Sequence, residues 1–558
     1  MGKGNGRDKE EALATARRAL SRLSARQKLD ALIDAEDPKA LVRSLPSQDL
    51  YYAIVEVGLQ DATEIVQLAS PAQFRGFVDL GGWKRDRLDP HEVLMWLRAA
   101  RAGAEPEDFL KKLDEVDMEV VEHLLRAFVT VYDLEEHPDV NPPGVTMESP
   151  EGRYLLELHV EGAELAALRA LLQDLFARSP FETTRLLEAT RWELPSELEE
   201  TAFRFRAGRL ADMGFPSLED AASLFAWVDP ATVMGPARSQ SSSQAGAEAA
   251  PLAAPQGRVD WVDAALRGLD DVERENLEDE LRDLANAVLV AEVQDPGDLE
   301  AVQKVAGMAR DYLALGLEHL CGGDPSLAAD CVREHPSRRI FGVGFSLTLQ
   351  LKFAADRLWK EPLSHVGPTW LVLSALQEVL SALRRKRPLR ALPVEGAEPV
   401  PFRSRRELEE AHKRVERARV QVSLFRALLG GDEASARARL SRFAQPLEIL
   451  GTERLLAAAA ANAVLDGEAT VAPVPADRLP DLFARLVTGT PDAPKVNPEA
   501  TLRVHAAFRK AVDEAAAAEG CLLADALLRR LCEEWGPSWL SEGKVPPQVG
   551  EIVPTQAA

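Results

Sequence analysis

Residues 37–81 read "DPKALVRSLPSQDLYYAIVEVGLQDATEIVQLASPAQFRGFVDLG", and the apolar residues of this stretch recur at an offset of 24 positions. The offset places Leu41 over Ile65 and Leu50 over Phe74. Each half predicts a short helix followed by a longer amphipathic helix. Because two such helices cannot bury their own apolar stripes, neighbouring pairs must stack. The stretch therefore predicts an all-α fold class, with a helical-repeat, α-solenoid-like domain in the N-terminal part.

A helix-start signal recurs at Ser70, Asp89 and Ser179. In each case an oxygen-bearing side chain is followed by Pro and, two residues further on, by Gln or Glu. The first residue can accept a hydrogen bond from the N3 amide, and Pro at N1 loses no helical bond. The signal therefore predicts short helices that begin at the three prolines.

One segment breaks the helical pattern. A helix is expected over 118–128, but residues 145–160 contain turn residues followed by alternating apolar residues at Tyr154, Leu156 and Leu158. Alternation of this kind is typical of a strand. The sequence predicts one small β-hairpin near 145–160, packed against the flanking helices because a lone hairpin is marginal in water.

Two resemblances can be stated. "SLPSQDLYYAIVEVG" followed by "DATEIVQLASPAQF", within residues 37–80, resembles the helical intracellular domain of bacterial magnesium channels and the middle domain of flagellar motor switch proteins. Over nearly its full length, through "GGWKRDRLDPHEVLMWL", "MGFPSLEDAASLFAWVDP" and "RIFGVGFSLTLQLK", the chain more closely resembles an uncharacterised bacterial family classed as a domain of unknown function. That family implies no activity. The membrane part of the channels has no counterpart here.

The composition indicates a large globular protein of more than one domain. The chain has 558 residues, of which 46% are hydrophobic. A run rich in Ala, Ser, Gln, Pro and Gly near residue 245 has little to bury and predicts a disordered linker. We expect a helical-repeat domain over 1–233, a linker over 234–258, a C-terminal helical bundle domain over 259–543 and a disordered tail over 544–558.

Net charge, apolar runs and cysteine content restrict the partners and the cellular compartment that we expect. The formal net charge of −24 disfavours wrapping of nucleic acid or adhesion to an anionic membrane. The longest uncharged run, 362–377, is shorter than the roughly 20 apolar residues that a membrane helix needs. Four cysteines in so long a chain fit a reducing compartment. We expect a soluble cytoplasmic protein with no membrane span and no lipid anchor.

The most metal-like set is His319, Cys321, Cys331 and His335. Cys331 and His335 share a helical face, but His319 and Cys321 would point to different sides of a helix unless it ended at the following Gly322. The alternative is two buried thiols and two surface imidazoles. We predict no metal site and no cofactor.

A basic tract follows the middle of the chain. Between residues 384 and 442 the sequence holds sixteen Lys or Arg against eight Asp or Glu. Its densest members are Arg384, Arg385, Lys386, Arg387, Arg403, Arg405 and Arg406. A polyanion or nucleic-acid site is one hypothesis, although no aromatic residues interleave for base stacking. The other hypothesis is intramolecular pairing with the acidic remainder.

A second candidate surface is the gap after the repeat, where Trp83, Lys84, Arg85 and Arg87 lie between two helices. Trp and Arg are enriched at interface hot spots, so this segment predicts a binding site for a protein partner. The alternative is that Trp83 closes the core while the cations are solvated.

No motif nominates a catalytic residue. Gly342 and Gly344 lack the third glycine and the Lys-Ser/Thr of a nucleotide-binding loop and are interpreted as points of close helix approach. We therefore predict a non-catalytic helical interaction or regulatory scaffold with protein partners. The alternatives are a polyanion-binding protein, through the basic tract, and an enzyme or metal protein whose site the spacing does not reveal.

Overall fold

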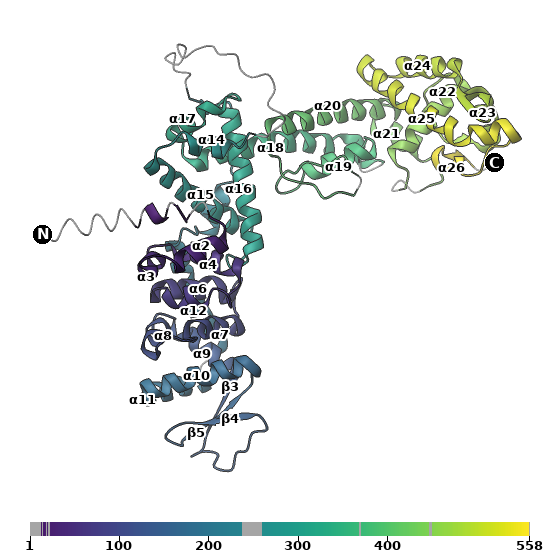
Figure 1. Ribbon diagram of the computed structural model, residues 1–558. Helices are drawn as coiled ribbons and strands as arrows, with labels where there is room; N and C mark the ends of the chain where they lie inside the picture. The colour runs from purple at the N-terminus through teal and green to yellow at the C-terminus, as the bar shows by residue number, and fades with distance from the viewer. Residues whose placement is uncertain are drawn as a thin grey trace, which may run out of the picture. The chain divides into compact units, whose positions relative to one another are not determined.

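The computed structural model describes residues 13, 15–17, 19–20, 23–192, 194–236, 259–367, 370–394, 396–445 and 449–556. Its chain divides into two compact units. Unit 1 comprises Met1–Phe225 and Asp270–Arg310, and unit 2 comprises Ala226–Leu269 and Asp311–Ala558. Helices dominate both units, which confirms the predicted all-α class with minor β elements (Figure 1).

The division differs from the predicted domain boundaries in two respects, because residues 226–233 group with unit 2 and residues 270–310 group with the N-terminal unit. Polar contacts across this long sequence separation hold residues 270–310 there. The Gln48 amide donates to Asn286 at 2.8 Å, and the Tyr51 hydroxyl donates to the Gly297 carbonyl at 3.0 Å. Most of the predicted linker, 237–258, lies outside the described residues.

The first helices of unit 1 are α2 (Ala25–Ile33), α3 (Pro38–Arg43), α4 (Ser47–Val57), α5 (Thr63–Leu68), α6 (Pro71–Gly81), α7 (Pro90–Arg101), α8 (Pro106–Leu113) and α9 (Met118–Phe128). The short–long pair α3–α4 recurs as α5–α6, as the sequence repeat predicts. α4 packs on α6, and α6 packs on α7 and α8, so the apolar stripes are buried between neighbours (Figure 1).

The predicted caps set where the helices begin. Ser70 and Gln73 form a complete capping box at the start of α6. Asp89 accepts hydrogen bonds from the amides of His91 and Glu92 at the start of α7. Ser179 accepts one from the Glu182 amide at the start of α11. All three predicted start signals are confirmed.

The predicted hairpin is part of a three-stranded antiparallel sheet. Its strands are β3 (Val129–Asp133), β4 (Val145–Glu148) and β5 (Tyr154–Leu158), in the order β3–β5–β4. β3 continues directly from α9 and was not predicted. Tyr154, Leu156 and Leu158 are buried, and the sheet packs against α11.

Unit 1 is completed by α10 (Gly162–Arg178), α11 (Pro180–Trp192), α12 (Pro195–Asp212), α13 (Leu218–Ser223), α15 (Asp271–Ala291) and the first part of α16 (Leu299–Leu320). Arg209 of α12 bonds both oxygens of Asp79 at 2.7 Å and reaches Asp117 at 2.6 Å. This ion-pair group, in which Asp79 is buried, joins α6, the N-terminus of α9 and α12.

Unit 2 contains the end of α16, one helix that precedes α16 in the chain, and the helices that follow it. These are α14 (Trp261–Arg267), η2 (Pro325–Leu327), α17 (Ala328–Glu334), α18 (Ser337–Trp359), η3 (Pro362–His365), α19 (Ser374–Leu383), α20 (Arg405–Leu428), α21 (Glu433–Leu440), α22 (Thr452–Asp466), η4 (Ala476–Arg478), α23 (Leu479–Leu486), α24 (Pro498–Ala511), α25 (Glu514–Glu542) and α26 (Val549–Ile552). α20 packs against α18, α19 and α25, and so joins the two ends of the unit (Figure 1).

α22 is the core helix of the C-terminal end of unit 2. Its residues from Thr452 to Leu465 are buried apart from Glu453 and Arg454. A helix that is apolar all round must be covered on every side. α23, α24, α25 and α26 supply this cover.

Two small strand pairs complete this end. β7 (Val487–Thr490) and β8 (Ala493–Val496) form an antiparallel hairpin, whereas β6 (Val474–Pro475) and β9 (Thr555–Gln556) pair in parallel. α26 and β9 lie where a disordered tail was predicted. Val549 and Val553 are fully buried there, and this burial holds the segment on the unit.

Within the described ranges, every helix is too short or too polar to cross a membrane.

Candidate functional site

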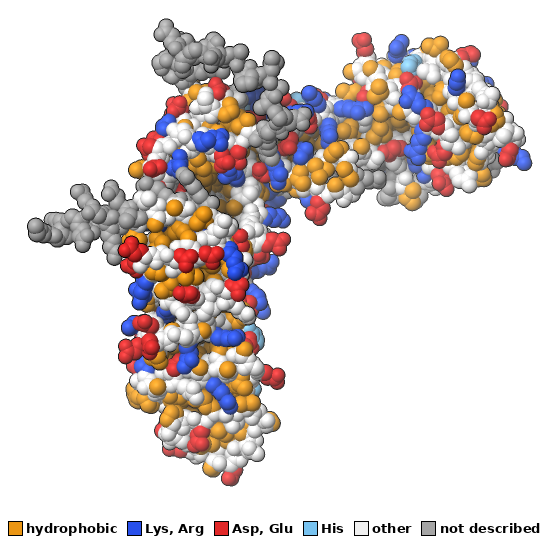
Figure 2. Space-filling model, viewed as in Figure 1, with side chains coloured by type: hydrophobic (Ala, Val, Ile, Leu, Met, Phe, Trp, Pro, Cys, Tyr) orange, Lys and Arg blue, Asp and Glu red, His pale blue; other side chains and the backbone are white. Residues whose placement is uncertain are grey.

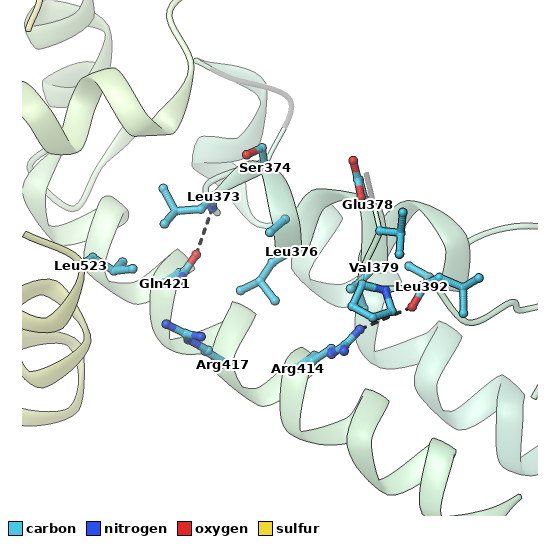
Figure 3. Close-up of a pocket in the computed structure, with 14 residues that line it drawn as sticks. Leu373, Ser374, Leu376, Glu378, Val379, Leu392, Arg414, Arg417, Gln421 and Leu523 are labelled. Atoms are coloured by element: carbon cyan, nitrogen blue, oxygen red, sulfur yellow. Dashed lines mark hydrogen bonds between the residues drawn. The ribbon is translucent and has the colours of Figure 1, made fainter. Parts of the chain in front are cut away.

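A cleft of about 690 Å³ in unit 2 lies between α19, α20 and residues 391–394. Leu523 of α25 lines one end of it. Figure 3 shows Leu376 and Val379 projecting from α19 toward this space, and Arg414 and Arg417 projecting from α20. Cavities of this size, with apolar walls and a few polar groups, are typical of ligand sites.

The walls of the cleft are held by buried contacts on either side. Val379 and Leu380 of α19 and Val415 and Val422 of α20 are buried. The side-chain carbonyl of Gln421, itself 1% exposed, accepts a hydrogen bond from the Leu373 amide at 2.9 Å. This bond fixes the N-terminus of α19 to the middle of α20.

Most of the lining is apolar. The apolar residues are Leu373, Ala375, Leu376, Val379, Ala391, Leu392, Pro393, Val394 and Leu523. The side chain of Val394 is 63% exposed, so the cleft has an apolar rim that is open to solvent. An apolar group entering the cleft would cover this rim.

Arg414 uses little of its hydrogen-bonding capacity in the cleft. Its guanidinium donates to the Ala391 carbonyl at 3.4 Å, a long hydrogen bond. Arg414 forms no ion pair with any residue that the structure describes. A guanidinium carries five N–H donors in a planar fork that matches a carboxylate. The remaining donors of Arg414 can therefore take an anionic group.

Arg417 and Gln421, by contrast, are already engaged. Both donate to one carboxylate oxygen of Glu519, at 2.7 Å from Arg417 and 2.6 Å from Gln421. The Glu519 side chain is only 12% exposed. Its bonds to Arg417 and Gln421 fix the positions of these two side chains at the end of the cleft next to α25.

A smaller cavity of about 90 Å³ adjoins the cleft. It shares Val379, Ala391, Pro393 and Arg414 with the larger cavity and also contacts Arg390 and Glu407. Arg414 therefore lines both cavities.

The chemistry of the lining favours binding. The fourteen lining residues include no His, Cys, Lys or Asp. Ser374 is the one hydroxyl among them and Glu378 the one carboxylate, and the Ser374 amide donates to Glu453 at 2.8 Å.

The segment predicted to bind a partner is a tight hairpin of β1 (Trp83–Lys84) and β2 (Arg87–Leu88). Trp83 is 3% exposed, and its indole lies under the Arg206 guanidinium at 5.0 Å. Lys84, Arg85 and Arg87 are exposed, and Lys84 pairs with Asp89 at 2.5 Å. The structure thus separates Trp83, which is core, from the three cations at the surface.

The hairpin tip is fixed to the rest of unit 1 by three hydrogen bonds. Arg85 has a positive φ of 63°, and its amide donates to Asp295 at 2.9 Å. Its carbonyl accepts from Arg206 at 3.1 Å. The Leu88 amide donates to Glu199 at 2.9 Å. These bonds hold the hairpin against the rest of unit 1.

Most of the named members of the basic tract make contacts within unit 2. Four of its members pair with acidic residues of unit 2: Arg384 with Asp356, Arg403 with Asp311, Arg405 with Glu409 and Arg406 with Glu410. Arg384 also stacks on Trp359 at 4.4 Å, and Arg387 lies over Phe345 at 5.6 Å. Arg385 and Lys386 are exposed. Figure 2 shows basic and acidic side chains interspersed on the visible face.

The four metal-like residues are only partly brought together. Cys321 and Cys331 are buried, His319 is half-buried, and His335 bonds the Met234 carbonyl at 2.8 Å. Across the described ranges, no three His, Cys, Asp or Glu side chains form a group that could hold a metal ion.

Sequence reasoning missed the cleft. Arg414 and Arg417 belong to the basic region counted from residue 384, but the candidate residues stopped at Arg406. The sequence did contain a signal for a polar stripe on α20. Arg414, Arg417 and Gln421 recur at i, i+3 and i+7, so they share one side of a helix whose apolar residues are largely buried. The opposite wall comes from α19 and from residues 391–394, and no sequence pattern places them there.

A comparison with protein families places the chain. A model described as a family of unknown function, DUF6178, covers residues 5–548. The chain belongs to the DUF6178 family. Neither the curated proteins nor the solved structures contain a match to it. The near full-length resemblance is thereby confirmed, and the likeness of residues 37–80 to the channel and motor switch domains stays a prediction.

Proposed function

We propose that this DUF6178 protein is a non-catalytic helical interaction protein, and that the cleft between α19 and α20 holds a segment of a protein partner. The observation that carries the proposal is Arg414, a guanidinium that lines an apolar cleft and forms no ion pair among the described residues. We further propose that the interaction takes place in the cytoplasm, because the four cysteines are free and free thiols are typical of a reducing compartment.

The partner segment combines apolar side chains with one acidic residue. Apolar surface of the segment that is buried against this lining contributes about 25 cal/mol per Å² to the free energy of binding. Arg414 adds a charge-assisted, bidentate hydrogen bond to a carboxylate. Arginine in a partly desolvated pocket is typical of interface hot spots, where truncation costs about 2 kcal/mol or more.

Charge complementarity acts at short range in this cleft. The whole chain carries −24, so its long-range field does not draw in an acidic partner. The pairing at Arg414 therefore supplies specificity, because a segment without the acidic residue leaves the guanidinium unpaired.

The test is recovery of partners with variants of the full chain at native level. Arg414→Glu reverses the charge inside the cleft, and Val394→Glu adds a negative charge at its exposed rim. Arg419→Glu is the matched control, because Arg419 lies on the same helix, is exposed and does not line the cleft. A specific partner is recovered with the parent and with Arg419→Glu, and is reduced at least tenfold with both cleft variants.

A second measurement assigns the contact. The partner segment is synthesised with its acidic residue intact or changed to the amide, and each form is titrated against the parent and Arg414→Ala. A double-mutant cycle then gives the coupling between the two groups. The proposal fails if the cleft variants recover the same proteins in the same amounts as the parent, or if the coupling is zero.

A further inference from the structure

The outer face of α11, in unit 1, carries the two most exposed aromatic side chains of the described residues. Phe181 and Trp192 are each 72% exposed, whereas the next aromatic side chain, Phe205, is 47% exposed. The two lie near opposite ends of α11, the helix that packs beside the β3–β5 sheet (Figure 1). Large apolar side chains that gather on one exposed face mark an interaction surface.

The two aromatic residues belong to a longer pattern. Four residues of α11 recur at spacings of four, three and four positions: Phe181, Arg185, Glu188 and Trp192. This is the spacing of successive core positions in a heptad repeat, so the four side chains follow one stripe along the helix, the α11 stripe. The buried side of the helix is formed by other residues, namely Thr183, Leu186, Leu187 and Thr190. The α11 stripe therefore lies on the solvent side.

The Trp192 indole is held in place although it is exposed. Its N–H donates to Glu188 at 3.1 Å, and the Arg191 guanidinium lies over its ring at 5.2 Å. Glu188 also accepts from the Tyr154 hydroxyl at 2.6 Å, which ties this group to β5. A side chain that is fixed beforehand loses less freedom on binding, and tryptophan is enriched at interface hot spots.

The α11 stripe is complementary to itself when two copies of the helix run antiparallel. The pair Phe181 and Trp192 has the same midpoint along the helix as the pair Arg185 and Glu188. A two-fold axis through this midpoint places Phe181 of one copy against Trp192 of the other. The same axis places Arg185 against Glu188. Each contact then occurs twice, as a closed two-fold interface requires.

The charges of the stripe match this arrangement. Arg185 is exposed and forms no ion pair with any residue that the structure describes. Glu188 belongs to an ion-pair group with two guanidiniums and three carboxylates, those of Arg153, Arg191, Asp133, Glu136 and Glu188. This group has one negative charge in excess, and Arg185 of the second copy balances it.

We propose that the protein self-associates through α11, with the α11 stripes of two copies packed antiparallel about a two-fold axis. Phe and Trp side chains bury about 150–250 Å² each, so the four rings of the pair bury about 600–1,000 Å². Standard specific interfaces bury about 1,200–2,000 Å², and smaller ones are weak. The dimer is therefore weak, with a dissociation constant on the order of 10 µM. It is separate from the α19–α20 cleft and does not depend on the function proposed for that cleft.

The test is the oligomeric state of the full-length protein, measured by sedimentation velocity over a range of concentrations around this value. Trp192→Ala removes the ring contact, and Arg185→Glu sets like charges against each other. Each should raise the dissociation constant at least tenfold. Arg98→Glu is the matched control, because Arg98 is an exposed arginine of α7 in the same unit and lies outside the stripe. This control should dimerise like the parent.

A photo-crosslinking measurement tests the antiparallel register. The photo-reactive analogue p-benzoylphenylalanine is incorporated in place of Phe181, and the protein is mixed with isotope-labelled parent, so that links between copies are recognised by mass. We expect links from position 181 to the peptide that contains Trp192 of the labelled copy. A parallel pair would instead link position 181 to position 181.

Circular dichroism melts first establish that the variants keep the melting temperature of the parent, as exposed positions should. The proposal is overturned if the parent stays monomeric at about ten times the expected dissociation constant. It is equally overturned if the dimer persists unchanged in Trp192→Ala and Arg185→Glu, or if Arg98→Glu weakens it as much. A monomer that binds phosphatidylcholine vesicles through Trp192 would assign the stripe to a lipid surface and would also overturn the proposal.

Discussion

A Cβ atom at Gly344 would lie 1.9 Å from the carbonyl oxygen of Tyr312, so α18 and the end of α16 meet backbone to backbone in unit 2. The Tyr312 ring lies edge-on to Phe341 and Phe345, at 5.3 and 5.4 Å. These aromatic contacts flank the close approach. The contact is reciprocal, because a Cβ at Gly316 of α16 would lie 2.0 Å from the Ile340 carbonyl.

Gly316→Ala should therefore destabilise unit 2 by about 1 to 3 kcal/mol or more, because the added methyl forces two helices apart. Gly307→Ala on the same helix is the control. Position 307 has no atom within 4 Å of an added Cβ, and alanine there should stabilise by about 0.5 to 1 kcal/mol. The melting temperatures of both variants, measured by calorimetry, test this prediction. Equal effects of the two substitutions would contradict the close approach.

Much of the fold could be predicted because its signals are local. The capping signal at Ser70, the period of α9 and the role of Gly342 and Gly344 as close-approach glycines each depend on neighbouring residues, and the structure confirms them. The grouping of residues 270–310 with unit 1 was not predictable. It depends on contacts such as Gln48 with Asn286, which lie far apart in sequence and leave no local pattern.

Trp83→Ala should lower the stability of unit 1 by about 3 to 5 kcal/mol, since the indole is buried beside Phe203 and beneath Arg206. The triple Ala variant of Lys84, Arg85 and Arg87 should keep the melting temperature of the parent, because these side chains are exposed. Circular dichroism melts of the two proteins test this. If the triple variant melts early and Trp83→Ala does not, the assignment of Trp83 to the core is wrong.

Val549→Asp should destabilise the C-terminal end of unit 2 by about 3 kcal/mol or more, because it places an unpaired charge in a fully buried position. The control is Gln548→Asp, one residue earlier and exposed, which should change stability by less than about 0.5 kcal/mol. Urea unfolding measures both. Tolerance of Val549→Asp would mean that α26 does not dock on the unit.

The candidate site was less predictable than the fold. The polar stripe of Arg414, Arg417 and Gln421 on α20 is readable from the sequence, but its meaning depends on which residues face it. Glu519 comes from a helix about a hundred residues later and engages Arg417 and Gln421, while Arg414 remains without an ion pair among the described residues. Sequence spacing cannot distinguish these two outcomes for two arginines three residues apart.

Lys112 should give unit 1 a pH-dependent stability. Its side chain is 3% exposed, its ammonium donates to the Gln67 carbonyl at 2.7 Å, and burial lowers its pKa to about 8. The unfolded chain keeps the ordinary lysine pKa of about 10.4. Between these two values the folded state has a neutral Lys112, whereas the unfolded state binds a proton.

Unfolding therefore takes up a proton in that window, and stability rises with pH. The full destabilisation by the buried charge is present below about pH 8 and is gone above about pH 10.4. Relative to Lys112→Met, the free energy of unfolding of the parent should rise across this window by on the order of 2 kcal/mol once solvent screening is allowed for. Lys111→Met is the matched control, because Lys111 is exposed, and its difference from the parent should stay flat. Urea unfolding of the three proteins at about pH 7.5, 9 and 10.5 gives the comparison. A flat difference between the parent and Lys112→Met would show that Lys112 is solvated in the folded protein.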